Sequence, residues 1–293
     1  MRIHDFPHDT QSQALLVTSS FELAEAVRAE VEKQTLLLSR RAILQESLAA
    51  SRCIVVSDIA AAMDVAQRHP DKNERQKHQA FVDLMIPVVK GWSTETGIDV
   101  ASLGVQVHGG MGFIEETGAA QHLRDARITT IYEGTTGIQA SDLVGRKIAR
   151  EGGATVKEWL KVLQQFDSEL GKSKNSDIQS LRTHLAAAVK AVEESVAFIL
   201  SAAGKDPNAA FAGAVPFLKL MGITAGGWQM ARAALIAEKK LPASEDKAFL
   251  EAKIKTARFF GDHVLSQASG LAATVTSGSA AVMSLSDEQF LAA

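Results

Sequence analysis

Hydrophobic residues recur every three or four positions along most of the chain, which is the spacing of one face of an α-helix. The first such stretch, residues 21–67, predicts one or two amphipathic helices. A break at residues 69–73 follows, and the spacing over residues 81–92 then predicts another packed helix, which carries Pro87. Residues 98–107 suit either a strand or a helix.

Beyond Gly152 and Gly153 the chain is rich in alanine and divides into four amphipathic segments. These are residues 156–170, 178–203, 209–240 and 244–269. Four such helices pack most economically as an antiparallel bundle. About the last 20 residues, rich in Ser and Ala, predict a flexible tail. Because strand-type alternation is scarce, we expect an all-α fold, with one helical domain at residues 1–152, whose first 50 or so residues are atypical, and an additional helical domain at residues 153–293.

The composition narrows the classes of function. Lys and Arg number 31 and Asp and Glu 34, so a net charge of −3 provides no strong field for nucleic acid or an anionic membrane. No apolar run reaches the roughly 18 residues of a membrane span, and the first residues lack the order of a signal peptide. Cys53 is the only cysteine, and no Cys/His cluster has zinc-ligand spacing. We therefore expect a cytoplasmic protein without a metal, with Cys53 inert in the core.

Glycine is concentrated in the centre of the chain. The first 90 residues have none, whereas residues 91–153 hold 12 of the 21. Flexible backbone of this kind indicates a site. Gly109, Gly110 and Gly112 fall within four residues, and such a turn can pass close to a ligand and point N–H groups at an anion. Taken alone, a glycine-rich turn is more often a plain connector between helices.

Two further motifs follow this turn. The ordered set Gln-x-x-Gly-Gly-x-Gly-aromatic, Arg-Asp and Tyr-Glu-Gly-Thr occupies residues 106–113, 124–125 and 132–135. This set resembles the C-terminal helical domain of the acyl-CoA dehydrogenase family. The continuation over residues 139–147 and the helical region after it resemble the larger subclass with an extra C-terminal domain, which includes the 3-methylmercaptopropionyl-CoA dehydrogenases. The resemblance implies FAD-dependent oxidation of an acyl-CoA thioester to a trans-2-enoyl-CoA.

The resemblance also implies a role for individual residues. Glu133 would be the general base that removes the α-proton while the β-hydrogen leaves as hydride to FAD, because a carboxylate in a dry site is basic enough for this step. Its backbone N–H would donate to the thioester oxygen. Gly134 would let the substrate approach, and Tyr132 would line the acyl pocket or pack in the core. The residues implied in FAD binding are Gln106, Gly109, Gly110, Thr135 and Gln139, of which the first three would touch the FAD of a neighbouring subunit.

The partners implied are an acyl-CoA substrate, electron-transferring flavoprotein or a similar acceptor, and further copies in a homo-oligomer. Arg124 and Asp125 are expected to orient loops through an ion pair. Arginines that hold the FAD diphosphate in the family have no clear counterpart here, although Arg40 and Arg41 lie upstream. The family's N-terminal helical and middle β domains also lack a counterpart. Two hypotheses follow: the C-terminal part of an acyl-CoA dehydrogenase, or a non-catalytic helical assembly module derived from one.

Overall fold

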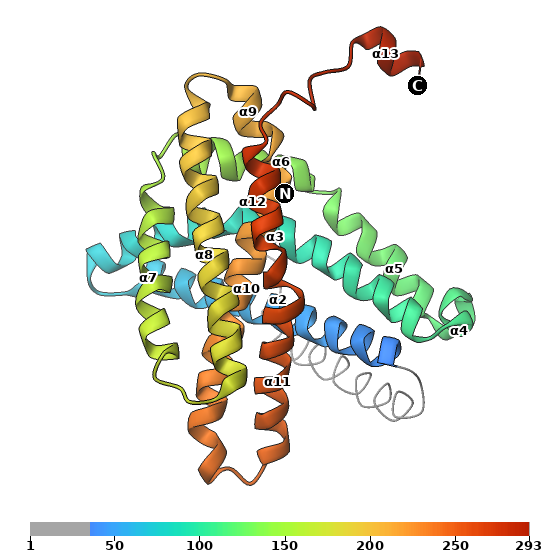
Figure 1. Ribbon diagram of the computed structural model, residues 1–293, viewed down its shortest axis with the longest axis vertical. Helices are drawn as coiled ribbons and strands as arrows, with labels where there is room; N and C mark the ends of the chain where they lie inside the picture. Colours follow the sequence, from blue (N-terminus) through green and yellow to red (C-terminus); the bar gives the residue numbers. More distant parts are fainter. Residues whose placement is uncertain (1–35, 293) are drawn as a thin grey trace.

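The computed structural model describes residues 36–292, and this part of the chain consists of helices joined by turns and loops, with no strand (Figure 1). The all-α fold class is thereby confirmed. The beginning of the predicted helix at residues 21–67, and with it the start of the predicted domain at residues 1–152, lies outside the described residues.

Two long antiparallel helices form the first half. Helix α2 spans Leu36–Arg68 and α3 spans Lys72–Val107. Asp71 begins α3, where its side chain accepts a hydrogen bond of 2.8 Å from the Asn73 N–H and satisfies one of the unpaired donors of the first turn. Helix α3 continues through residues 98–107, so this ambiguous segment is helical.

A series of short elements returns along α3 from its C-terminal end. They are α4 (Gly110–Phe113), the 3-10 turn η1 (Glu115–Thr117), α5 (Ala119–Arg127), the 3-10 turn η2 (Ile128–Thr130), α6 (Thr136–Asp142) and the π-helical turn η3 (Leu143–Ala149). In Figure 1, α4 lies at one end of α5 and α6 lies beyond its other end. The fold therefore separates the glycine-rich turn from the segment that carries Glu133.

The second half contains the predicted alanine-rich helices, two of them interrupted. They are α7 (Ala154–Leu170), α8 (Ser176–Ala203), α9 (Pro207–Ala212), α10 (Ala214–Lys240), the 3-10 turn η4 (Leu241–Ala243), α11 (Lys247–His263), the 3-10 turn η5 (Leu265–Gln267), α12 (Ala268–Thr276) and α13 (Asp287–Ala292). The break between α9 and α10 falls at Gly213, where a Cβ atom would lie 2.7 Å from the Val275 backbone. Close packing of α12 on this turn requires glycine there.

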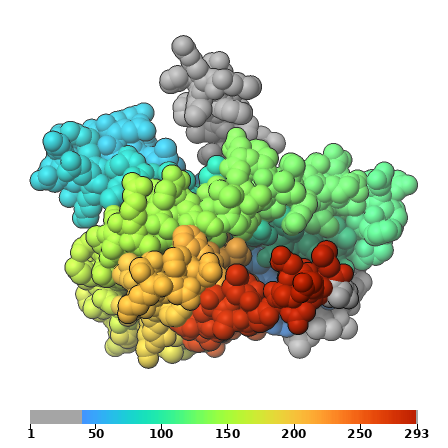
Figure 2. Space-filling model, turned by 90° about the horizontal axis from the view of Figure 1, so that it is seen from above, coloured from blue at the N-terminus to red at the C-terminus, as the bar shows by residue number. Residues whose placement is uncertain are grey.

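The core runs without interruption between the two halves. The Trp92 side chain of α3 is only 3% exposed and packs on Gly222 of α10, where a Cβ atom would lie 2.1 Å from the indole Cγ. Gly226, one turn later, lies against the same indole and against Phe260 of α11. In Figure 2 the surfaces of residues 110–150 (green) and of the later helices (orange to red) adjoin. Trp92 therefore joins the predicted domains in a single core.

Cys53 lies on the outer face of α2. Its exposure shows that the expectation of a core cysteine is wrong. Val55 and Ile59, four residues apart, are the buried side of this helix, and Cys53 stands two positions before Val55, on the opposite side. Among the described helices, none is long and apolar enough to span a membrane.

Candidate functional site

Glu133 lies in the loop between η2 and α6, in an uncommon backbone conformation. With φ of 55°, it is the one non-glycine residue with positive φ in the described part of the chain. Gly134 follows with φ of 93°, and a Cβ atom there would lie 3.1 Å from Gln139 Nε2. Left-handed backbone is unfavourable for a residue with a side chain, and such strain often marks functional sites.

The Glu133 side chain points away from the core and is 70% exposed. Its Oε2 lies 3.7 Å from Lys90 Nζ, and the same ammonium donates a hydrogen bond of 3.4 Å to the Glu133 carbonyl oxygen. Tyr132 is 54% exposed, so the alternative that it packs in the core is wrong. The loop therefore presents both side chains outward.

Contacts with α3 fix the start of α6. Thr135 caps the helix, since its Oγ1 accepts a hydrogen bond of 3.3 Å from the Ile138 N–H. Thr136 Oγ1 donates to Glu95 Oε1 of α3 over 2.6 Å. One turn further along α3, burial raises the pKa of Asp99, the charge of Lys219 opposes that shift and the charge of Glu95 adds to it. Polar contacts thus tie α6 to the long helix.

The glycine-rich turn contains glycines of two kinds. A Cβ atom at Gly109 or Gly110 would meet nothing within 4 Å, whereas one at Gly112 would lie 2.2 Å from the Val105 carbonyl oxygen. Gly112 is therefore needed for packing. Gly109, with φ of 61°, and Gly110 leave the backbone open to a ligand.

Arg41 stands beside Gln106 at this turn. Its Nη1 donates a hydrogen bond of 3.3 Å to Gln106 Oε1. The hairpin of α2 and α3 brings these residues together, although they are 65 positions apart. Had the two helices been predicted as an antiparallel hairpin, the start of the first would have been expected beside the end of the second, and Arg41 beside Gln106. The spacing of hydrophobic residues did not predict that arrangement, and Arg41 had no predicted role. An arginine, an amide and two open glycines together suit an anionic group such as a diphosphate.

The residues implied in cofactor binding form two separate groups in one copy of the chain. Lys90 contacts Glu133, and Gln106 follows sixteen positions later on the same helix, which at 1.5 Å per residue is about 24 Å away. Thr135, Gln139 and Glu133 lie together beside the middle of α3, and Gln106, Gly109 and Gly110 lie together at its C-terminal end. The fold therefore does not bring these groups to one point.

Arg124 forms its ion pair with a different residue from the one expected. Its Nη2 lies 3.3 Å from Glu115 Oε1, rather than pairing with the adjacent Asp125. Neighbouring helical positions point apart, which explains the difference. The pair joins η1 to α5 and supports the glycine-rich turn.

Large hydrophobic side chains are exposed over the same region. Between residues 111 and 138 they are Met111, Phe113, Ile114, Ile128, Ile131, Tyr132 and Ile138. A run of exposed apolar side chains of this kind is typical of a surface that another protein surface covers.

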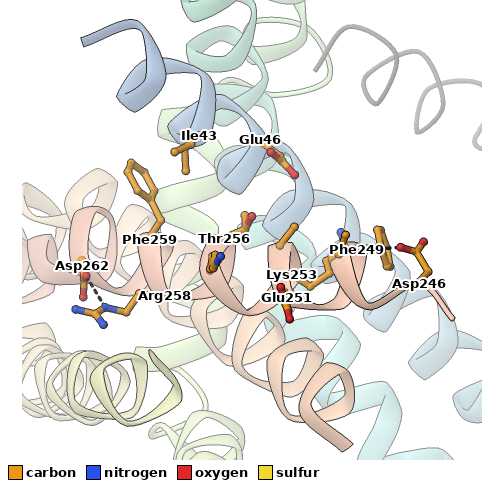
Figure 3. A pocket seen from close by; sticks show the side chains of 13 residues that line it. Ile43, Glu46, Asp246, Phe249, Glu251, Lys253, Thr256, Arg258, Phe259 and Asp262 are labelled. Carbon is orange, nitrogen blue, oxygen red and sulfur yellow. Dashed lines mark hydrogen bonds and ion pairs between the residues drawn. The ribbon is translucent and has the colours of Figure 1, made fainter. Parts of the chain in front are cut away.

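Two cavities among the described residues lie elsewhere. A groove of about 810 Å³ lies between α2 and α11, where Ile43 and Glu46 face Phe259 and Thr256 (Figure 3). A smaller cavity of about 270 Å³ includes Arg150 of the turn after η3. Neither contains a residue of the three motifs. The described residues also contain no group of His, Cys, Asp and Glu that could hold a metal ion.

Comparison with known proteins explains the motifs. The family model described as "Acyl-CoA dehydrogenase, C-terminal domain" matches residues 17–149. A second, "Acetyl-CoA dehydrogenase C-terminal like", matches residues 153–286. The chain belongs to the acyl-CoA dehydrogenase family. It corresponds to the C-terminal helical part of that family, in the form that carries an additional C-terminal region.

Individual acyl-CoA dehydrogenases are similar over much of the chain. It is 46% identical over 214 residues to 3-methylmercaptopropionyl-CoA dehydrogenase of Ruegeria pomeroyi, covering 73% of this chain and 36% of that protein. It is 35% identical over 193 residues to a broad-specificity linear acyl-CoA dehydrogenase of Mycobacterium tuberculosis, covering 62% of this chain and 31% of that protein. The chain thus spans about a third of the length of these relatives.

A solved structure shares the fold. The crystal structure of an acyl-CoA dehydrogenase complexed with FAD from Bacillus anthracis aligns with a TM-score of 0.65 at 15% identity. The alignment covers 92% of this chain and 47% of that one. At this level of identity the likeness concerns the fold.

Proposed function

We propose that the chain is the C-terminal helical part of an FAD-dependent acyl-CoA dehydrogenase that converts an acyl-CoA thioester into a trans-2-enoyl-CoA, with Glu133 as the general base. The observation that carries this proposal is the position of Glu133. The carboxylate is exposed on a strained loop next to Gly134, at the start of a helix tied to α3. This placement leaves the carboxylate accessible to a substrate carbon.

Both the side chain and the backbone N–H of Glu133 can act on the substrate. Its carboxylate accepts the α-proton, and its backbone N–H donates to the thioester oxygen on which negative charge develops. Within the described residues this N–H has no hydrogen-bond partner, which leaves it available for that role. Tyr132, adjacent and exposed, lines the acyl site.

Residues at the glycine-rich turn and beside Glu133 hold the cofactor. Gln106, Gly109 and Gly110 bind FAD with Arg41, whose guanidinium suits the diphosphate. Thr135 and Gln139 contact FAD beside Glu133. When bound, FAD accepts the hydride that leaves the β-carbon.

The separation of the two groups supports a homo-oligomer. Because they lie about 24 Å apart along α3, residues of one copy complete the cofactor site of another. The exposed hydrophobic side chains between residues 111 and 138 fit a surface that is covered in such an assembly. We also propose two domains, residues 1–152 and 153–293, electron-transferring flavoprotein or a similar protein as acceptor, and a cytoplasmic location.

The experiment is a flavin absorbance measurement. The purified chain is mixed with FAD, freed of excess by gel filtration and read at about 450 nm, before and after anaerobic addition of an acyl-CoA. Retained flavin that bleaches with acyl-CoA supports the proposal. Glu133→Gln should retain flavin without bleaching, and Glu116→Gln, which changes another exposed carboxylate of this region, should bleach as the wild type does. Equal bleaching of Glu133→Gln and wild type would refute Glu133 as the base.

A second candidate is a non-catalytic helical assembly module. The 70% exposure of the Glu133 side chain favours it, because neither described cavity encloses the base. A chain that retains no flavin would support this candidate.

A further inference from the structure

The Lys90 ammonium contacts Glu133 at two points. It donates to the Glu133 carbonyl oxygen over 3.4 Å and lies 3.7 Å from the carboxylate Oε2. One cation therefore holds both the main chain and the side chain of the same residue. Because the carbonyl and the carboxylate are both held by one cation, the backbone and side-chain torsions of Glu133 that separate them have little freedom.

The Glu133 conformation needs support of this kind. Its φ of 55° is unfavourable for a residue with a Cβ atom, and the following Gly134, at 93°, adds no side chain to restrain the loop. Two backbone hydrogen bonds lie close by, from the Ile131 N–H (3.0 Å) and the Tyr132 N–H (3.1 Å) to the Ile128 carbonyl oxygen, and both precede the strained residue. Among residues 36–292, Lys90 is therefore the group whose side chain contacts Glu133 itself.

The backbone of Lys90 is rigidly placed. The next residue, Gly91, is buried so closely that a Cβ atom there would lie 2.8 Å from Leu218 Cδ1 of α10 and 3.4 Å from the Gln139 Cβ. Lys90 thus extends from the point where α3, α6 and α10 meet. Groups on rigid elements position a reactive side chain better than groups on loops.

We propose that Lys90 is a positioning residue, which fixes the conformation of Glu133 through its carbonyl and carboxylate and thereby aims the base and its N–H. This inference rests on the proposed function for its catalytic consequence. The contact itself does not depend on that function. Loss of Lys90 should release Glu133 to other backbone conformations.

The first test reports on the loop without flavin or substrate. Tyr132 is the only tyrosine and neighbours Glu133, so 3-fluorotyrosine gives a single ¹⁹F resonance from this loop. Lys90→Met, which removes the charge and keeps an unbranched side chain, should shift and broaden that resonance. Lys90→Arg, which keeps a cation, should restore it. Lys77→Met is the matched control, because Lys77 is exposed on the same helix about 20 Å away. If Lys90→Met leaves the resonance as Lys77→Met does, the inference is overturned.

The second test measures the rate of flavin reduction by acyl-CoA in the flavin-loaded protein. Lys90→Met should lower the limiting rate about 10- to 100-fold, the effect of a displaced catalytic group, with little change in the half-saturating acyl-CoA concentration. Lys90→Arg should recover most of that rate. An unchanged limiting rate, or equal losses in both variants, would overturn the catalytic role. If the proposed function is wrong, the result differs: Glu133→Gln would then show flavin reduction like the wild type. The ¹⁹F measurement would still decide whether Lys90 holds the loop.

Discussion

Substitution of Gly222 by alanine tests the packing that joins the two halves of the molecule. Gly222 lies within α10, where the added Cβ atom would stand 2.1 Å from Cγ and 2.5 Å from Cδ1 of Trp92. These atoms belong to the attached end of a ring that is 3% exposed, so the indole cannot turn aside. Either Trp92 or the backbone of α10 must move.

The change in the free energy of unfolding caused by Gly222→Ala is the difference between a gain in helix propensity and a cost of overpacking. Alanine is about 1 kcal/mol better than glycine inside a helix. Overpacking a close-packed core costs about 1–3 kcal/mol, and occasionally more. Since the contact must open by about 1.4 Å to reach ordinary carbon separation, the upper end applies. We expect a net loss of about 2 kcal/mol, which for a chain of this size lowers the unfolding temperature by about 5 °C.

The assay is thermal unfolding followed by circular dichroism at fixed pH and protein concentration. Gly270→Ala is the matched control, because Gly270 lies in α12 with nothing within 4 Å of its added Cβ atom. That variant should unfold about 2 °C above the wild type. Gly222→Ala should lower the whole transition, because Trp92 and Gly222 belong to different halves. A Gly222→Ala protein that unfolds at or above the wild-type temperature would refute this account of the core.

Three further outcomes are expected. Gly134→Ala should lose about 1–2 kcal/mol of stability in denaturant unfolding, because φ is 93° there, whereas Gly110→Ala should be unchanged. Hydrogen bonds from Arg182 hold the pKa of Asp167 below its ordinary value of 3.8, so this pair stabilises the fold above that pH and loses its effect as the pH falls through the lowered value. Asp167→Asn should therefore melt earlier than wild type at neutral pH and equally at strongly acid pH. Cys53 should react with a thiol reagent in the folded protein, and protection until unfolding would contradict its exposure.

Local patterns in the sequence determined most helices. Hydrophobic residues spaced three and four positions apart predicted α7 and α8 to within two residues at each end. An amphipathic helix can be recognised from its own sequence, because the residues of its buried face recur at this spacing. The motif residues likewise carried the family resemblance, which the comparisons confirmed. The fold class and family could therefore be predicted from the sequence.

Breaks and ambiguous segments depended on distant contacts. Residues 98–107 became helical as a continuation of α3, which local alternation could not decide. Glycine is required at the break, at Gly213, because the backbone of Val275, more than sixty positions away, occupies the space of a Cβ atom. Propensity describes a segment in isolation, whereas these features arise from its neighbours.

At the candidate site, the sequence by itself determined the chemical groups: a carboxylate at Glu133, glycines around it and an amide at Gln106. Only the tertiary structure decided their surroundings. It placed Lys90 on the carbonyl and carboxylate of Glu133, brought Arg41 to Gln106 and separated the two groups along α3. The reason is that packing of helices brings together residues far apart in sequence, and a contact between individual polar side chains of different segments leaves no periodic trace in the sequence.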